Sequence, residues 1–152
     1  MSHDKLNFEE LQGRISQSPF NQWMNVRLER MEEDGITVSC VRRPEMVGSV
    51  YTGALHGGLL GCLLDTAASF ALIARTGQTV ATIDFRVNFH RPCTAAQLQA
   101  RARVVHNGRK LATVDVQLSE GDGSRLIASG QGVFHHLLLP TTLAAGALSG
   151  AG

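Results

Sequence analysis

The sequence predicts an α+β fold in which one antiparallel sheet wraps around a single long, apolar helix. Three observations predict it: an apolar segment at residues 56–74 with one formal charge, two alternating segments before it, and a run of about four alternating segments after it. A parallel α/β fold would need a crossover helix after each strand, and the chain offers one such helix. At 152 residues the chain suits one domain, predicted over 1–137, with a small-residue-rich tail over 138–152.

The segments before the apolar helix follow from local patterns. We expect a short amphipathic helix from Phe8 to Ser16, with Asn7 as its N-cap. The next residues are expected to turn and to deliver Trp23 toward the core. Residues 25–43 alternate as two strands around a turn at Asp34-Gly35.

The apolar helix is expected to begin at the Gly57-Gly58 pair, after a loop over 44–55, and to end near Gly77. Its length raises the question of a membrane span, but a charged Asp65 at its centre is costly in lipid. A helix that is apolar nearly all round is also typical of the buried centre of a globular fold. We therefore expect a core helix, with Cys62 as a small core residue.

The segments after this helix are predicted to be strands. In residues 79–92, strict alternation puts Thr82 and Arg86 on one face. The other face then carries the apolar residues Ala81, Ile83, Phe85, Val87 and Phe89. Residues 98–104 alternate in the same way, and Asn107-Gly108 predicts a hairpin.

Composition limits the classes of partner and cofactor. Lys+Arg 14 against Asp+Glu 13 gives a net charge of +1, which indicates no nucleic acid and no anionic membrane as partner. The cysteines Cys40, Cys62 and Cys93 are far apart and form no CxxC, which fits a cytoplasmic protein without zinc or a disulfide framework. His135 and His136 would point to opposite faces of a strand, so no metal site is expected there. The first residues lack the pattern of a signal peptide.

The single acid of the apolar helix is the main candidate for chemistry. Asp65 could simply form a structural ion pair with an arginine of the sheet, such as Arg86 or Arg101. Alternatively, it faces a cleft and acts as a nucleophile or a general base. Ser69 follows four residues later on the same helix face, where its hydroxyl could hold the carboxylate or a water molecule.

The "HGG" at residues 56–58 supports the second interpretation. A helix N-terminus offers unpaired N–H groups to an oxyanion, and glycine lets a carbonyl approach them closely. Gly57 and Asp65 are eight residues apart, which is about 12 Å along a helix. Because this is too far for both to act on one carbonyl, the amide must come from one subunit and the carboxylate from another. A dimer is therefore predicted.

Taken together, "GALHGGLLGCLLDTAASFA" and "TVATIDFRVNFHRP" resemble the hot-dog-fold thioesterases, specifically their PaaI-like acyl-CoA thioesterase branch, over roughly residues 20–137. The resemblance implies a hot-dog fold, active sites between the subunits of a homodimer, dimers paired into a homotetramer, and hydrolysis of acyl-CoA. By position it implies that the Gly57 N–H polarises the thioester carbonyl with His56 beside it, and that Asp65 attacks or activates water. Ser69 and Thr82 match hydroxyl positions that line the site.

One position departs from the pattern of that branch. Many members carry Asn or Gln seven residues before the oxyanion-hole glycine, whereas this chain has Val50, whose side chain cannot form hydrogen bonds. Tyr51 or Thr52 could take its place. A non-catalytic acyl-CoA-binding module therefore stays an alternative, and an acyl-thioester hydratase using His56 is a less favoured one.

Coenzyme A would be part of the substrate, so no separate cofactor is expected. Its phosphates need cations at the mouth of the site. The candidates are Arg91 at the end of a strand, and Arg109 and Lys110 just after the predicted hairpin turn.

Overall fold

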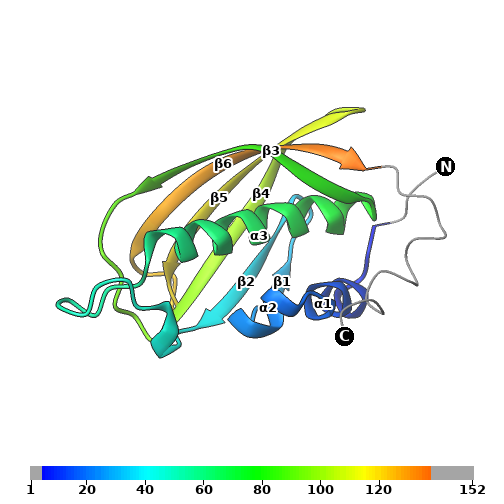
Figure 1. Ribbon diagram of the computed structural model, residues 1–152. Helices are drawn as coiled ribbons and strands as arrows, with labels where there is room; N and C mark the ends of the chain where they lie inside the picture. Colours follow the sequence, from blue (N-terminus) through cyan, green and yellow to red (C-terminus); the bar gives the residue numbers. More distant parts are fainter. Residues whose placement is uncertain (1–4, 138–152) are drawn as a thin grey trace, which may run out of the picture.

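The computed structural model describes residues 5–137, in which a six-stranded antiparallel sheet curves around one long helix (Figure 1). Helix α3 (Gly57–Thr76) lies along the concave side of this sheet. The strands are β1 (Arg27–Met31), β2 (Gly35–Val41), β3 (Thr79–Phe89), β4 (Gln97–Asn107), β5 (Leu111–Glu120) and β6 (Leu126–Leu137). Their order is β1-β2-β4-β5-β6-β3, which confirms the predicted α+β class. The predicted tail over 138–152 lies outside the described residues.

The first helix, α1 (Phe8–Gln17), begins where the sequence predicts. The Asn7 side chain accepts a hydrogen bond from the Glu10 N–H at 3.0 Å, and the Glu10 carboxylate accepts one from the Asn7 N–H at 2.9 Å. This reciprocal pair satisfies two donors that the start of a helix otherwise leaves free.

The expectation that Trp23 enters the core is wrong. Residues Pro19–Met24 form a short helix, α2, instead of a turn, and its helical rotation buries Met24 completely while Trp23 stays 37% exposed. The indole stacks on Phe20, with ring centroids 6.0 Å apart, and the Arg43 guanidinium lies over it. Trp23 thus anchors a surface cluster.

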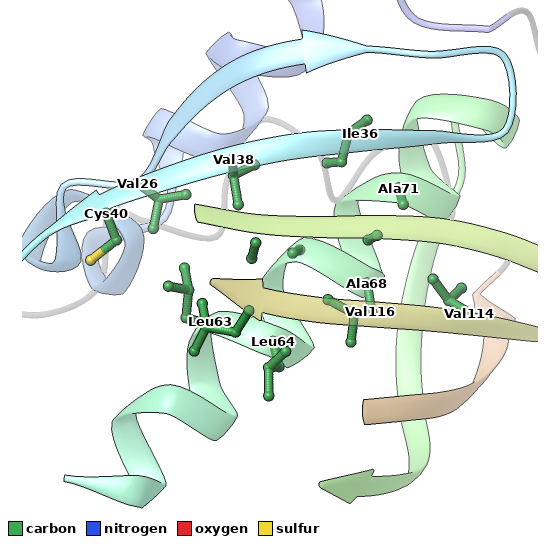
Figure 2. Close-up of a cluster of buried hydrophobic side chains, with 14 of the residues drawn as sticks. Val26, Ile36, Val38, Cys40, Leu63, Leu64, Ala68, Ala71, Val114 and Val116 are labelled. Atoms are coloured by element: carbon green, nitrogen blue, oxygen red, sulfur yellow. The ribbon is translucent and has the colours of Figure 1, made fainter. Parts of the chain in front are cut away.

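Helix α3 is the centre of the hydrophobic core. His56 caps its start, and Gly77 ends it with a left-handed φ of 66°, which glycine adopts without strain. Figure 2 shows its inner side meeting the sheet, with Leu63, Leu64, Ala68 and Ala71 of the helix close to Val38, Val114 and Val116. The helix is long and apolar enough to cross a membrane, yet half of its apolar stretch is buried inside this fold. The expected core helix is therefore observed.

One side of α3 is left open by the described residues. Cys62 is exposed on that side, so its prediction as a core residue is wrong. Asp65, Thr66 and Ser69 lie on the same side and are only partly buried. The sheet covers one side of the helix, whereas the side that carries Cys62, Asp65 and Ser69 is only partly covered by residues 5–137.

Strand β3 contains a β-bulge that the sequence pattern does not reveal. Thr82 lies opposite Phe134 of β6 but Asp84 lies opposite Val133, so Ile83 is an extra residue. The extra residue shifts the alternation by one, which puts Thr82 on the α3 side together with Phe85. Strict alternation, which places Thr82 on the outer face with Arg86, is therefore wrong at this point.

The predictions for strand β4 and for the turn that follows it hold. Leu98, Ala100, Ala102 and Val104 all point into the core. The chain reverses at Asn107-Gly108, between β4 and β5, as predicted.

Candidate active site

The Asp65 carboxylate is held by a hydrogen bond from strand β3. Thr82 Oγ1 donates to Asp65 Oδ1 at 2.9 Å, across 17 residues of chain. The bulge at Ile83 makes this contact possible because it turns Thr82 toward the helix. Burial raises the pKa of Asp65 above its ordinary value, and the Thr82 hydroxyl opposes that rise.

The structural ion pair expected as an alternative does not form. Arg101 pairs with Glu32 at 2.8 Å, and neither Arg101 nor Arg86 forms an ion pair with Asp65. Within residues 5–137 the carboxylate has no cationic partner. A carboxylate with a raised pKa and no counter-ion, on the open side of its helix, suits proton transfer better than a structural role.

Ser69, the predicted neighbour of Asp65, and Cys62 lie one turn to either side of Asp65 on α3. Ser69 lies one turn further along the open side of α3, and no hydrogen bond from its hydroxyl to Asp65 is formed. Cys62 lies one turn before Asp65, and burial together with the Asp65 charge raises the pKa of its thiol. A raised thiol pKa keeps Cys62 protonated, so it is a weak nucleophile.

The N-terminus of α3 carries the second half of the site. His56 Nδ1 accepts a hydrogen bond from the Gly58 N–H at 2.9 Å. The preceding Gly57 N–H finds no acceptor among the described residues, and it belongs to the first helical residue. The helix thus presents one free amide at its positive end, as predicted.

Phe89 is a neighbour of this amide that the sequence alone does not identify. A Cβ at Gly57 would lie 3.5 Å from the Phe89 ring, so the ring packs directly against that glycine. The ring is still 56% exposed. The alternating pattern places Phe89 on an apolar strand face, but only the fold brings this end of β3 to the start of α3.

The loop before α3 projects away from the rest of the chain (Figure 1). Val50 and Tyr51 at its tip are 87% and 96% exposed. Thr52 Oγ1 already accepts the Ala54 N–H at 3.3 Å. The base of the loop is fixed by Arg42, whose guanidinium donates to the carbonyl of Gly53 at 2.7 Å.

The two halves of the site are well separated within one chain. Gly57 and Asp65 belong to the same continuous helix, so the predicted spacing of about 12 Å holds.

The three predicted phosphate-binding cations lie at two opposite ends of the sheet. Arg91 follows the end of β3, whereas Arg109 and Lys110 lie beyond the opposite end, because Leu111 and Ala81 both pair with His135.

The residue types that could hold a metal do not gather in residues 5–137. They contain no cluster of three or more His, Cys, Asp or Glu side chains arranged to hold an ion. His135 is exposed and His136 buried, so the adjacent pair points to opposite faces as predicted. His136 Nε2 contacts Asn107 Oδ1 at 2.9 Å.

Comparison with known proteins gives a consistent result. Residues 52–127 match the family model of the Thioesterase superfamily. The medium/long-chain acyl-CoA thioesterase YigI of Escherichia coli K12 is 30% identical over 115 residues, which cover 66% of this chain and 74% of YigI.

Two solved structures extend the similarity beyond the matched segment. A protein described as from the thioesterase superfamily is 33% identical, with a TM-score of 0.81, and the match covers 84% of this chain and 96% of that one. The PaaI protein from the phenylacetic acid degradation operon of E. coli has a TM-score of 0.74 at 20% identity, covering 86% of this chain and 96% of that one. At that identity the comparison shows a shared fold.

Proposed function

The chain belongs to the thioesterase superfamily and is a thioester hydrolase, and from this premise we propose that it hydrolyses acyl-CoA to a carboxylic acid and free CoA. The observation that carries the proposal is the Asp65 carboxylate, which is partly buried, lacks a counter-ion among the described residues and is held by Thr82. The relative YigI is a medium/long-chain acyl-CoA thioesterase, which supports an acyl-CoA substrate.

In the proposed reaction, a water oxygen bonds to the thioester carbonyl carbon while Asp65 takes a proton from the water. The carbonyl oxygen becomes negative and is stabilised by the Gly57 N–H at the positive end of α3. The C–S bond then breaks, and the CoA sulfur leaves and receives the proton. Asp65 can instead attack the carbonyl carbon itself: the C–S bond breaks, the CoA thiolate leaves, and an anhydride forms on Asp65. Water then hydrolyses the anhydride, which regenerates the Asp65 carboxylate and supplies the proton that the thiolate takes up. Ser69 is proposed to line the site beside the carboxylate.

We propose that each site combines Gly57 of one subunit with Asp65 of the other, because the separation along α3 is about 12 Å. The free edge of β3 supports this, since β3 is the last strand of the sheet and carries Ile83 exposed at 57%. Antiparallel pairing of two β3 edges gives a closed two-fold dimer. Pairing of such dimers into a homotetramer and a cytoplasmic location are further parts of the proposal.

The same pairing would bring the predicted phosphate-binding residues together, although they lie at opposite ends of the sheet within one chain. In an antiparallel β3 pair, the end of β3 in one copy lies beside the start of β3 in the other copy. Arg91 of one copy therefore lies on the same side of the dimer as Arg109 and Lys110 of the other copy. We propose that these three side chains bind the phosphates of coenzyme A. Replacing both Arg109 and Lys110 with alanine should raise KM for acyl-CoA and leave kcat nearly unchanged.

The two alternative functions have different support. A hydratase would need His56 as a base, but its Nδ1 lone pair already accepts the Gly58 N–H, so a neutral ring carries its proton on Nε2 and has no free lone pair. A non-catalytic acyl-CoA-binding module is favoured by Val50, which offers no polar group where many relatives of the predicted branch do. Turnover of acyl-CoA by the wild type separates this second alternative from the hydrolase.

The proposal is tested by release of free CoA thiol from aryl-, short-, medium- and long-chain acyl-CoAs. Asp65→Asn should lower kcat by at least about 100-fold with the oligomer intact, because a general base contributes on the order of 10²–10⁴. Asp115→Asn is the matched control, as Asp115 is also partly buried but lies on β5, bonded to Gln131. Acyl-CoA binding without turnover by the wild type would contradict the hydrolase and favour the binding module.

The shared site has its own test. Gly57→Pro removes the amide donor at the first helical position, which accepts proline well, and the preceding His56 has the extended backbone that proline requires. Mixing this variant with Asp65→Asn should restore about a quarter of wild-type activity, since random pairing makes half of the dimers mixed, each with one intact site. A mixture as inactive as its components would contradict a site built from two subunits.

A further inference from the structure

We propose that His56 supplies the second hydrogen-bond donor of the oxyanion hole, with its Nε2–H directed to the thioester carbonyl oxygen beside the Gly57 N–H. The inference rests on the proposed function and assigns His56 a specific role in it. Three features carry it: the tautomer of the ring, the fixed placement of the ring, and the lack of a side-chain donor at position 50 of the preceding loop.

The tautomer follows from the helix cap. The Gly58 N–H donates to His56 Nδ1 at 2.9 Å, so Nδ1 must be unprotonated. The proton of the neutral ring is therefore on Nε2. Among the described residues Nε2 has no hydrogen-bond partner, and His56 is exposed, so this N–H remains available to a ligand.

Two glycines fix the placement of the ring. A Cβ at Gly48 would lie 2.8 Å from His56 Cα and 3.2 Å from its Cδ2, and a Cβ at Gly58 would lie 3.0 Å from Nδ1. Backbone therefore packs closely against both edges of the imidazole, where larger residues would displace it. The Met46 carbonyl also accepts the His56 N–H at 2.9 Å. The ring is held in position before substrate arrives, which is the condition for electrostatic stabilisation of a transition state.

The loop before the helix offers no competing side-chain donor at the usual position. Val50 has no polar side-chain atom, and it lies at the exposed tip of the loop, 87% exposed. His56 directly precedes the free Gly57 amide, so its ring N–H and that amide belong to consecutive residues. Neither donor gives up its proton: each forms a stronger hydrogen bond as the carbonyl oxygen becomes negative during attack.

The capping and donating roles of the ring can be separated by substitution. In His56→Asn, the side-chain oxygen can replace Nδ1 as the helix cap, but no donor reaches the position of Nε2. In His56→Gln, the amide nitrogen can reach the position of Nε2, but the cap is weakened. We expect His56→Asn to keep the wild-type Tm and to lower kcat by about 100-fold or more, with KM changed much less. We expect His56→Gln to lower Tm and to recover part of the lost kcat.

Binding of a non-hydrolysable acyl-CoA ketone, in which a methylene replaces the thioester sulfur, gives a readout independent of turnover. The wild type and Asp65→Asn should bind it similarly, and His56→Asn should bind it more weakly than either. Wild-type kcat in His56→Asn would overturn the inference, as would losses in both His56 variants that merely follow their losses in Tm. If wild-type protein shows no turnover, the proposed function itself fails; if it turns over but His56→Asn equals it, only the role of His56 fails.

Discussion

Replacing Thr82 with valine removes the hydrogen bond that holds the Asp65 carboxylate. The bond is 2.9 Å long, and valine keeps nearly the same shape without the hydroxyl. Burial raises the pKa of Asp65 and this bond lowers it, so its loss must raise the pKa further. A base has to be ionised to act, so the acid limb of the pH profile of kcat/KM should move to higher pH.

The size of this shift can be estimated from the bond. A hydrogen bond to a charged group contributes about 1.5–3 kcal/mol, and one pKa unit corresponds to about 1.4 kcal/mol. Because Asp65 is only partly buried, water replaces part of the lost bond and the lower end applies. We therefore expect a shift of about one pH unit, so that activity on the acid limb falls about tenfold at fixed pH.

The assay is release of CoA thiol across pH with the wild type and three variants. Thr82→Ser keeps the hydroxyl and should behave like the wild type. Thr79→Val makes the same exchange at an exposed position of β3 and should leave the profile unchanged. If Thr82→Val is folded and its acid limb does not move, Asp65 is not the group whose ionisation limits the rate.

Three further predictions concern stability. Asp65→Asn should raise Tm at pH 7, because a carboxyl with a raised pKa costs folding free energy when it is ionised. Below about pH 4 the carboxyl is protonated in both the folded and the unfolded state, so the gain in Tm should vanish there. Equal Tm values of the variant and the wild type at all pH values would contradict this prediction. Gly132→Ala should lower the free energy of unfolding in urea by about 1–3 kcal/mol, because its Cβ would meet the Phe134 ring at 2.5 Å. Gly13→Ala on α1, where nothing lies within 4 Å of the new Cβ, should raise that free energy by about 0.5–1 kcal/mol. Asn7→Ala should lower the free energy of unfolding by about 1 kcal/mol through loss of the capping box, and an unchanged urea midpoint would argue against that cap.

Much of the fold could be predicted because its signals are local. The boundaries of α1 and α3 depend on caps such as Asn7 and Gly77, and the alternation of polar and apolar residues along a strand records which face is buried. The single acid in an apolar helix also stands out in the sequence. Asp65 and the "HGG" segment are therefore recognisable as candidates from residue types and spacing alone.

Other features depend on contacts between distant segments. The apolar character of Trp23 and Cys62 predicts a place in the core, but which side of a helix is covered depends on its neighbours. The Thr82–Asp65 bond joins residues 17 positions apart and exists only because the register against β6 inserts Ile83 as a bulge. A period-2 pattern holds no record of an inserted residue, since the bulge is decided by pairing with another strand.

The sequence by itself thus determined the elements, their order and the acid at the centre of the buried helix, because these follow from caps and periodicity within a few residues. Only the tertiary structure decided which side of that helix stays open and that Thr82 rather than an arginine holds Asp65. Each of these is set by atoms that meet through packing and backbone hydrogen bonding, whose geometry the order of residues along the chain does not specify.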